Sequence, residues 1–104
     1  MHYTVVAKFK EACATEFLGK LTDGTIENQK PDGKEIIASM DRARIDESGL
    51  IRWNEVCYCA TPLEHERQTV YDHYFLDLKT QQVDEYADVE ERPFMEHLRQ
   101  LAGN

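Results

Sequence analysis

The segment KPDGKEIIASMDRARID, Lys30–Asp46, decides the fold because it suits either of two secondary structures. In the first interpretation Lys30–Gly33 is a turn, since proline presets φ and glycine accepts a positive φ. Two paired strands, Thr25–Gln29 and Lys34–Asp46, would then flank this turn. We favour this interpretation because the sequence that follows Asp46 can pair with the second of these strands.

The second interpretation makes most of the same segment a helix. Asp32 would cap this helix, and Glu35, three residues later, would complete a capping box. One apolar stripe at helical spacing would be buried: Ile36, Met40 and Ala43. In that case only residues 42–46 remain for a strand.

The next part of the chain predicts a β-hairpin. Asp46–Gly49 has the composition of a turn, and Leu50–Ala60 (LIRWNEVCYCA) has the composition of a strand. Pairing across the turn places three pairs of residues opposite each other: Ile45 and Leu50, Arg42 and Trp53, Ala38 and Cys57. One face of the hairpin is then apolar, which favours packing in a core. It consists of Ile36, Ala38, Met40, Ile51, Trp53, Cys57 and Cys59.

The same hairpin would bring charged residues to this apolar face. Arg42, Arg44 and Glu55 would lie beside Trp53, and together with Asp72 they are the best candidates for a functional site. Charges among apolar neighbours must be paired or hydrated, because an unpaired buried charge is costly. Two explanations stay open. Glu55 and an arginine form a structural ion pair on which Trp53 stacks, or the cluster lines a cavity for a small apolar or anionic ligand.

Periodicity predicts the remaining elements. His2–Lys10 alternates as a strand does, and Thr69–Leu78 is a further segment rich in aromatic and β-branched residues. Between these strands, residues 11–24 carry an apolar stripe typical of a short helix: Ala14, Phe17, Leu18 and Leu21. The acidic stretch Asp84–Glu91 is interpreted as a solvated loop, and Pro93 suits the first turn of a C-terminal helix. The stripe of that helix is Phe94, Met95, Leu98, Leu101 and Ala102.

Two cysteines and two histidines follow one another closely in the sequence: Cys57, Cys59, His65 and His73. The two thiols would share one face of a strand at about 6–7 Å, which is too wide for one tetrahedral ion. We therefore expect core packing for the cysteines and no metal site. His65, flanked by two acids, is expected at the surface.

Acid–base chemistry has three weak candidates in the sequence. Asp72 and His73 are adjacent in the predicted strand, so they point to opposite faces and cannot pair with each other. Glu55 is the third residue that could transfer a proton.

Composition excludes several classes of protein. The 104 residues suit one domain, residues 1–104, and 41% of them are hydrophobic, as in globular proteins. The formal net charge is −8 without a basic run, which argues against nucleic-acid binding. The sequence has no apolar run of membrane-spanning length and no signal-peptide pattern at its start, and three cysteines are too few for a disulfide framework. A reduced, cytoplasmic protein that does not contact membranes is expected.

These observations predict an α+β domain with a mainly antiparallel sheet, a helix after the first strand and a C-terminal helix. The alternative architecture is the ferredoxin-like dimeric α+β barrel, an analogy that carries no function. Aromatics expected on the uncovered sheet face suggest a homodimer: Tyr58, Tyr71, His73 and Phe75. The function expected is a small-ligand-binding or interaction module without a cofactor. The alternative is a small cofactor-independent enzyme, of isomerase or oxygenase type, that transfers a proton through a buried carboxylate or histidine.

Overall fold

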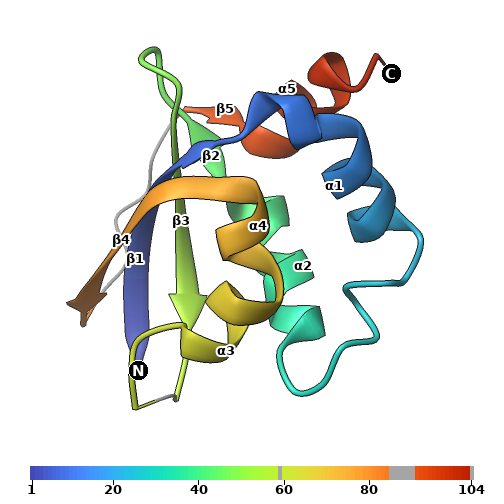
Figure 1. The fold of residues 1–104 in the computed structure, drawn as a ribbon. Coiled ribbons are helices and arrows are strands. Elements are labelled where there is room, and N and C mark those ends of the chain that lie inside the picture. Colours follow the sequence, from blue (N-terminus) through green and yellow to red (C-terminus); the bar gives the residue numbers. More distant parts are fainter. Residues whose placement is uncertain (59, 85–90, 104) are drawn as a thin grey trace.

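The structure is a computed structural model and describes residues 1–58, 60–84 and 91–103 (Figure 1). Its strands are β1 (His2–Phe9), β2 (Arg44–Ile45), β3 (Leu50–Val56), β4 (Phe75–Val83) and β5 (Arg92–Pro93). Its helices are α1 (Ala14–Thr22), α2 (Gly33–Arg42), α3 (Glu64–Glu66), α4 (Asp72–Tyr74) and α5 (Phe94–Leu101). A 3-10 turn η1 (Glu11–Cys13) precedes α1, and a π-helical segment η2 (Arg67–Tyr71) joins α3 to α4.

The strands form one antiparallel sheet in the order β4-β1-β3-β2-β5. Up to β4, the succession is one strand, the two helices α1 and α2, two strands, the helical segment from α3 to α4, and one strand. It differs from the ferredoxin-like order of strand, helix, strand, strand, helix, strand in having two helices between β1 and β2. β5 then extends the sheet beyond β2, and α5 packs against α1 and α2. The predicted α+β class, with a helix after the first strand and a C-terminal helix, is confirmed.

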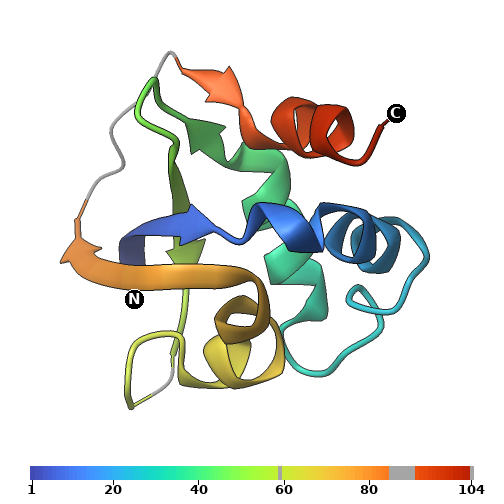
Figure 2. The same cartoon turned by 45° about the horizontal axis from the view of Figure 1, so that its top comes forward.

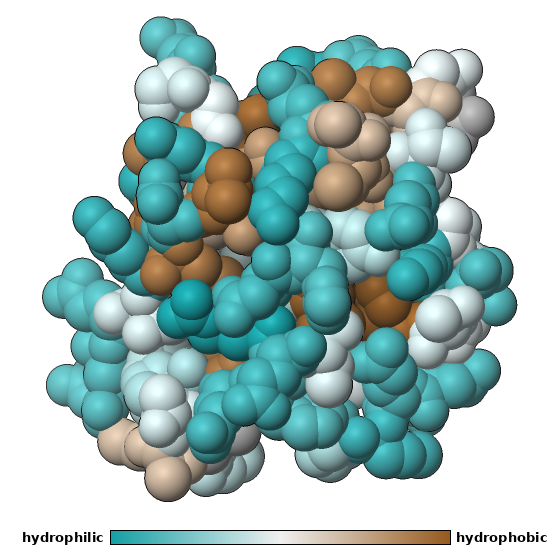
Figure 3. Space-filling model, viewed as in Figure 1, coloured by the Kyte–Doolittle hydropathy of each residue, from teal (hydrophilic) through white to brown (hydrophobic). Residues whose placement is uncertain are grey.

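The helices cover one face of the sheet, and the core lies between them (Figures 1 and 2). Val5 and Ala7 of β1 and Ile51 and Trp53 of β3 point into this core, whereas the residues between them are half-buried on the open face. Aromatic rings fill the centre in contact with one another: Phe9, Phe17, Trp53, Tyr71, Phe75 and Phe94. The face of the molecule drawn in Figure 3 is largely hydrophilic with separate apolar patches, as the charged composition suggests.

The strand interpretation of the deciding segment is wrong, and its helical alternative is correct. Residues 33–42 form α2, and the predicted stripe is buried at Ile36, Met40 and Ala43. Thr25–Gln29 forms turns, so it offers no strand for pairing. The predicted hairpin register is also wrong, because Ile45 faces Ile51 and only two residues remain in β2.

The second error concerns Thr69–Leu78. The chain is helical from Glu64 to Tyr74, and β4 begins only at Phe75. Tyr71 and Phe75, which were expected on the uncovered sheet face, are buried in the core. The aromatic face that suggested a homodimer therefore does not exist.

Other predictions have mixed outcomes. The helix that carries Phe17 and Leu21 and the strand that begins at Leu50 are confirmed. Pro93 lies in β5, directly before α5, instead of inside the helix. Most of the acidic stretch 84–91 lies outside the described residues. Within the described part of the chain, no helix has the length and apolar character required to cross a membrane.

Side chains of α2 protect the part of β3 that β2 leaves unpaired. Arg42 Nη2 donates to the carbonyl of Asn54 at 2.6 Å, and Glu35 Oε2 accepts from the amide of Val56 at 3.0 Å. Arg42 and Glu35 also form an ion pair at 3.3 Å. These contacts satisfy backbone groups that would otherwise attract a foreign strand.

We expect Arg42→Ala to lower the free energy of unfolding by about 1–2 kcal/mol, because it leaves the Asn54 carbonyl without its charged donor. Urea unfolding monitored by circular dichroism measures this loss. Arg99→Ala is the control, since Arg99 is an exposed arginine in the last turn of α5. An equal loss in both variants would contradict the protective role of Arg42.

Candidate metal centre

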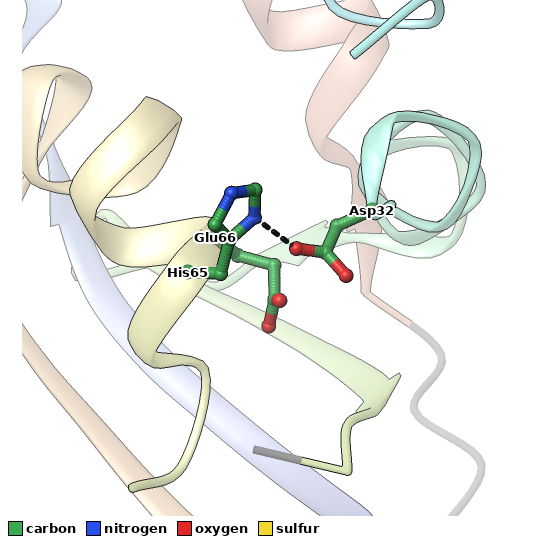
Figure 4. A group of neighbouring side chains, drawn as sticks. All are labelled: Asp32, His65 and Glu66. Atoms are coloured by element: carbon green, nitrogen blue, oxygen red, sulfur yellow. Dashed lines mark hydrogen bonds and ion pairs between the residues drawn. The ribbon is translucent and has the colours of Figure 1, made fainter. Parts of the chain in front are cut away.

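Three side chains from two distant segments converge beside the N-terminus of α2. Asp32 precedes α2, whereas His65 and Glu66 belong to α3, and each residue offers one metal-ligating atom. These three atoms all lie within 4.8 Å of one another. Figure 4 shows His65 Nδ1 in contact with Asp32 Oδ2 and the carboxyl group of Glu66 next to them.

Asp32 occupies the capping position of α2, yet its side chain makes no capping hydrogen bond. Aspartate at this position normally accepts a bond from the first helical turn. Here its carboxylate contacts His65 instead. The other member of the predicted capping box, Glu35, binds β3 and not the helix end. The capping prediction located the helix start correctly but assigned both carboxylates to the wrong partners.

α3 holds the other two residues at different depths. Leu63, which precedes α3, is fully buried with a positive φ of 56°, and it anchors the turn into the helix. The side chains of His65 and Asp32 are 41% and 21% exposed, whereas Glu66 as a residue is only 2% exposed. Glu66 therefore forms the buried side of the cluster, and His65 forms the side that faces solvent.

The local electrostatics penalise a second negative charge. Burial is the main reason that the pKa of Glu66 rises to about 7, and the neighbouring Asp32 raises it further through a hydrogen bond and its charge. A hydrogen bond with the buried thiol of Cys57 acts in the opposite direction. Two carboxyl groups therefore share a site that favours one proton or another positive charge.

A second buried carboxyl group lies deeper in the core. Trp53 Nε1 donates to Glu55 Oε1 at 2.9 Å, and the hydroxyl of Tyr71 donates to the same oxygen. Burial raises the pKa of Glu55 to about 8, and the charge of Glu66 adds to this rise. Burial and the nearby Glu55 also raise the pKa of Tyr71.

The structure separates the cluster predicted around Trp53. Glu55 and Trp53 share a face of β3 and are hydrogen-bonded, as their spacing suggests. Arg42 and Arg44 do not join them: Arg42 binds the β3 backbone, and Arg44 donates to the carbonyl of Ala43 at 3.2 Å. The Glu55–arginine ion pair, one of the two explanations left open above, is therefore not formed: Arg42 lies on α2, where a strand was predicted, and Arg44 binds the backbone.

Asp72 and His73 lie in α4 and are exposed, not in a strand. Asp72 forms an ion pair with Arg67 at 3.0 Å. His73 lines a small polar cavity of about 170 Å³ together with Lys20 and Gln29. Neither residue reaches the cluster of Asp32, His65 and Glu66.

The sequence interpretation did not identify this cluster, because it expected no metal site. It assigned Asp32 to a turn or a helix cap, His65 to the surface, and Glu66 only the role of an acid beside His65. The run Glu64-His65-Glu66 was the available signal, since an imidazole between carboxylates has metal-ligand chemistry. Cys57 is buried and not bridged, as expected, and Cys59 lies outside the described residues. No protein-family model, curated protein or solved structure matches this chain.

Proposed function

We propose that this protein binds one divalent transition-metal ion between Asp32, His65 and Glu66. The observation that supports this is the convergence of an imidazole nitrogen and two carboxylate oxygens within 4.8 Å of one another. Ligand atoms around one ion, with metal–ligand distances of about 2.0–2.2 Å, fall within such a span. On binding, the ion would replace the direct contact between His65 and Asp32.

The donor atoms restrict the choice of metal. Calcium and magnesium prefer oxygen ligands alone, whereas imidazole suits zinc, iron, copper and nickel. One nitrogen and two carboxylate oxygens therefore favour zinc or a neighbouring transition metal. The chain's net charge of −8 also favours the approach of cations to the molecule in general.

Three protein ligands leave at least one coordination position for water. Structural zinc sites use four protein ligands, whereas catalytic sites use three and keep a position open. Here the exposed sides of His65 and Asp32 would allow that position to face solvent. An ion held in this way lowers the pKa of its bound water and makes it a nucleophile. We therefore propose metal-assisted hydrolysis or hydration of a small substrate, in place of the cofactor-independent chemistry expected from the sequence.

Isothermal titration of the metal-stripped protein with zinc chloride tests the binding. We expect one zinc ion per chain, and at least about tenfold weaker binding after His65→Ala or Glu66→Gln, because each variant removes one ligand. Manganese chloride, titrated in parallel, should bind more weakly than zinc.

His97 provides a matched control for these variants. Its Nε2 lies 3.8 Å from a carboxylate oxygen of Glu11, so it is also a histidine beside an acid, but the described residues place no third ligand atom close enough to complete a group of three. His97→Ala should bind zinc as the wild type does. Absence of zinc binding to the wild type, or an equal loss in His97→Ala and His65→Ala, would overturn the proposal.

A further inference from the structure

The outer edge of the sheet has a long strand without a neighbour. β4 is the first strand in the order β4-β1-β3-β2-β5, and among the described strands it pairs with β1 alone. β4 has nine residues, and alternate residues along it therefore direct their backbone N–H and C=O groups away from the sheet. Edges of this kind form hydrogen bonds with another strand when one is available.

Within the described residues, an irregularity that hinders such pairing lies only near the beginning of β4. The register shifts opposite the segment between Val6 and Lys8, where Asp77 has a positive φ of 53°. This bulge bends the strand there. From Lys79 to Val83 the pairing with β1 is regular, and the segment 78–83 contains no proline and one charged residue. The two other exposed edges differ, since β3 is covered by α2 side chains and β5 has two residues.

The charge of β4 suits a second copy of this chain. Two copies with a net charge of −8 repel each other over most of their surfaces. β4 carries one acid, Asp77, and one base, Lys79, so two β4 edges approach without net repulsion. We propose that two copies of this protein pair through the outer edges of β4 and form one continuous antiparallel sheet.

Symmetry limits the register of this pairing. In an antiparallel sheet, two residues that lie opposite each other point to the same face. A two-fold axis perpendicular to the sheet therefore pairs each residue of one copy with the same residue of the other copy, or with one an even number of positions away. A centre at Lys79 would place two lysines face to face, which is unfavourable. A centre at Thr80 places the two threonines opposite each other and Lys79 opposite Gln81, with no like charges in contact. Threonine pairs are favourable across strands.

The pairing of two short edges buries little surface, so the dimer forms only at high protein concentration. It uses neither the metal ligands nor the core and is independent of the proposed metal binding. The homodimer proposed here uses the edge of the sheet, whereas the homodimer expected from the sequence used an aromatic face of the sheet.

Sedimentation velocity between about 10 µM and 1 mM tests the pairing. We expect the sedimentation coefficient of the wild type to rise from the monomer value toward the dimer value over this range. Gln81→Lys should weaken dimerisation at least about tenfold, because in the register centred at Thr80 it places the new lysine of each copy opposite Lys79 of the other and so creates two pairs of like charges. Gln68→Lys makes the same change at an exposed helical position of η2 and should leave dimerisation unchanged.

Amide hydrogen exchange supplies a second measurement that does not depend on molecular shape. Alternate amides between residues 78 and 82 should become protected as the concentration of the wild type rises, but not in Gln81→Lys. A wild type that stays monomeric at 1 mM would overturn the proposal. So would a dimer that Gln81→Lys and Gln68→Lys weaken equally.

Discussion

Replacement of Gly33 by alanine is expected to lower the free energy of unfolding by about 3 kcal/mol or more. A Cβ atom at this position would lie 2.1 Å from the carbonyl oxygen of Ile26 and 2.6 Å from that of Glu27. Both obstacles are backbone atoms, so no side chain can rotate to make room. The clash can be removed only if α2 moves away from the turns at residues 26–29. This movement would break the hydrogen bond that Gly33 N donates to Gln29 O at 2.9 Å. For a domain of this size the melting temperature should fall by roughly 12 °C or more.

Gly19 provides the matched control for this substitution. It lies inside α1, and a Cβ atom there would have no neighbour within 4 Å. Alanine is a better helix former than glycine, so Gly19→Ala should stabilise the protein by about 0.5–1 kcal/mol. Thermal unfolding of both variants therefore gives shifts of opposite sign. A Gly33→Ala protein as stable as the wild type would show that α2 does not approach residues 26 and 27 so closely.

The second large effect concerns pH and Glu55. Burial raises the pKa of this carboxyl group from 4.5 to about 8 in the folded protein. Between these two pH values the carboxyl group is ionised in the unfolded chain but protonated in the folded protein. The contribution of Glu55 to the free energy of unfolding is therefore fully present below pH 4.5 and is lost as the pH rises toward 8. One pKa unit corresponds to about 1.4 kcal/mol, and the full difference amounts to as much as about 4–5 kcal/mol. We expect Glu55→Gln to remove this decline, because glutamine has no proton to release.

Urea unfolding at several pH values from 5 to 8.5, with EDTA to remove metal ions, measures the difference between wild type and Glu55→Gln. As the pH rises, the free energy of unfolding of Glu55→Gln should increase steadily relative to that of the wild type. Glu47→Gln removes a charge from the exposed turn between β2 and β3 and should follow the wild type. If the free energies of unfolding of the wild type and of Glu55→Gln change with pH in the same way, Glu55 is ionised in the folded protein at neutral pH.

The deciding segment shows why sequence periodicity can mislead. Ile36 and Met40 are four residues apart, which places them on one face of a helix and also on one face of a strand. The spacing alone therefore does not distinguish the two structures. Ala43, which is seven residues after Ile36 and also buried, fits the helix and not the strand. The close packing of Gly33 against residues 26 and 27 adds a tertiary contact that has no signal in the sequence.

The segment 69–74 was misjudged for a different reason. Val70, Tyr71 and Tyr74 have high β propensity, and propensity favoured a strand. In the structure these residues are buried on the inner side of η2 and α4. Tertiary packing therefore outweighed local preference, as it often does for short apolar segments.

The first strand and the first helix were predictable because their patterns are unambiguous. β1 alternates over eight residues, and α1 has a stripe that fits no strand. The cluster proposed to bind a metal was not predictable in the same way. Asp32 and His65 are 33 positions apart, and only the packing of α3 beside the start of α2 brings them together. Glu55 and Trp53 were correctly placed on one face because both belong to one strand, but their direct hydrogen bond was not predicted.

The central place of β1 has a consequence for synthesis on the ribosome. β1 is made first, yet both of its partners, β3 and β4, begin more than 40 residues after it ends. Until residues 50–83 have been translated, its apolar side chains have no sheet to join, and the nascent chain exposes them to chaperones and proteases. A ribosome that stalls between β3 and β4 would therefore release a fragment that cannot complete its sheet.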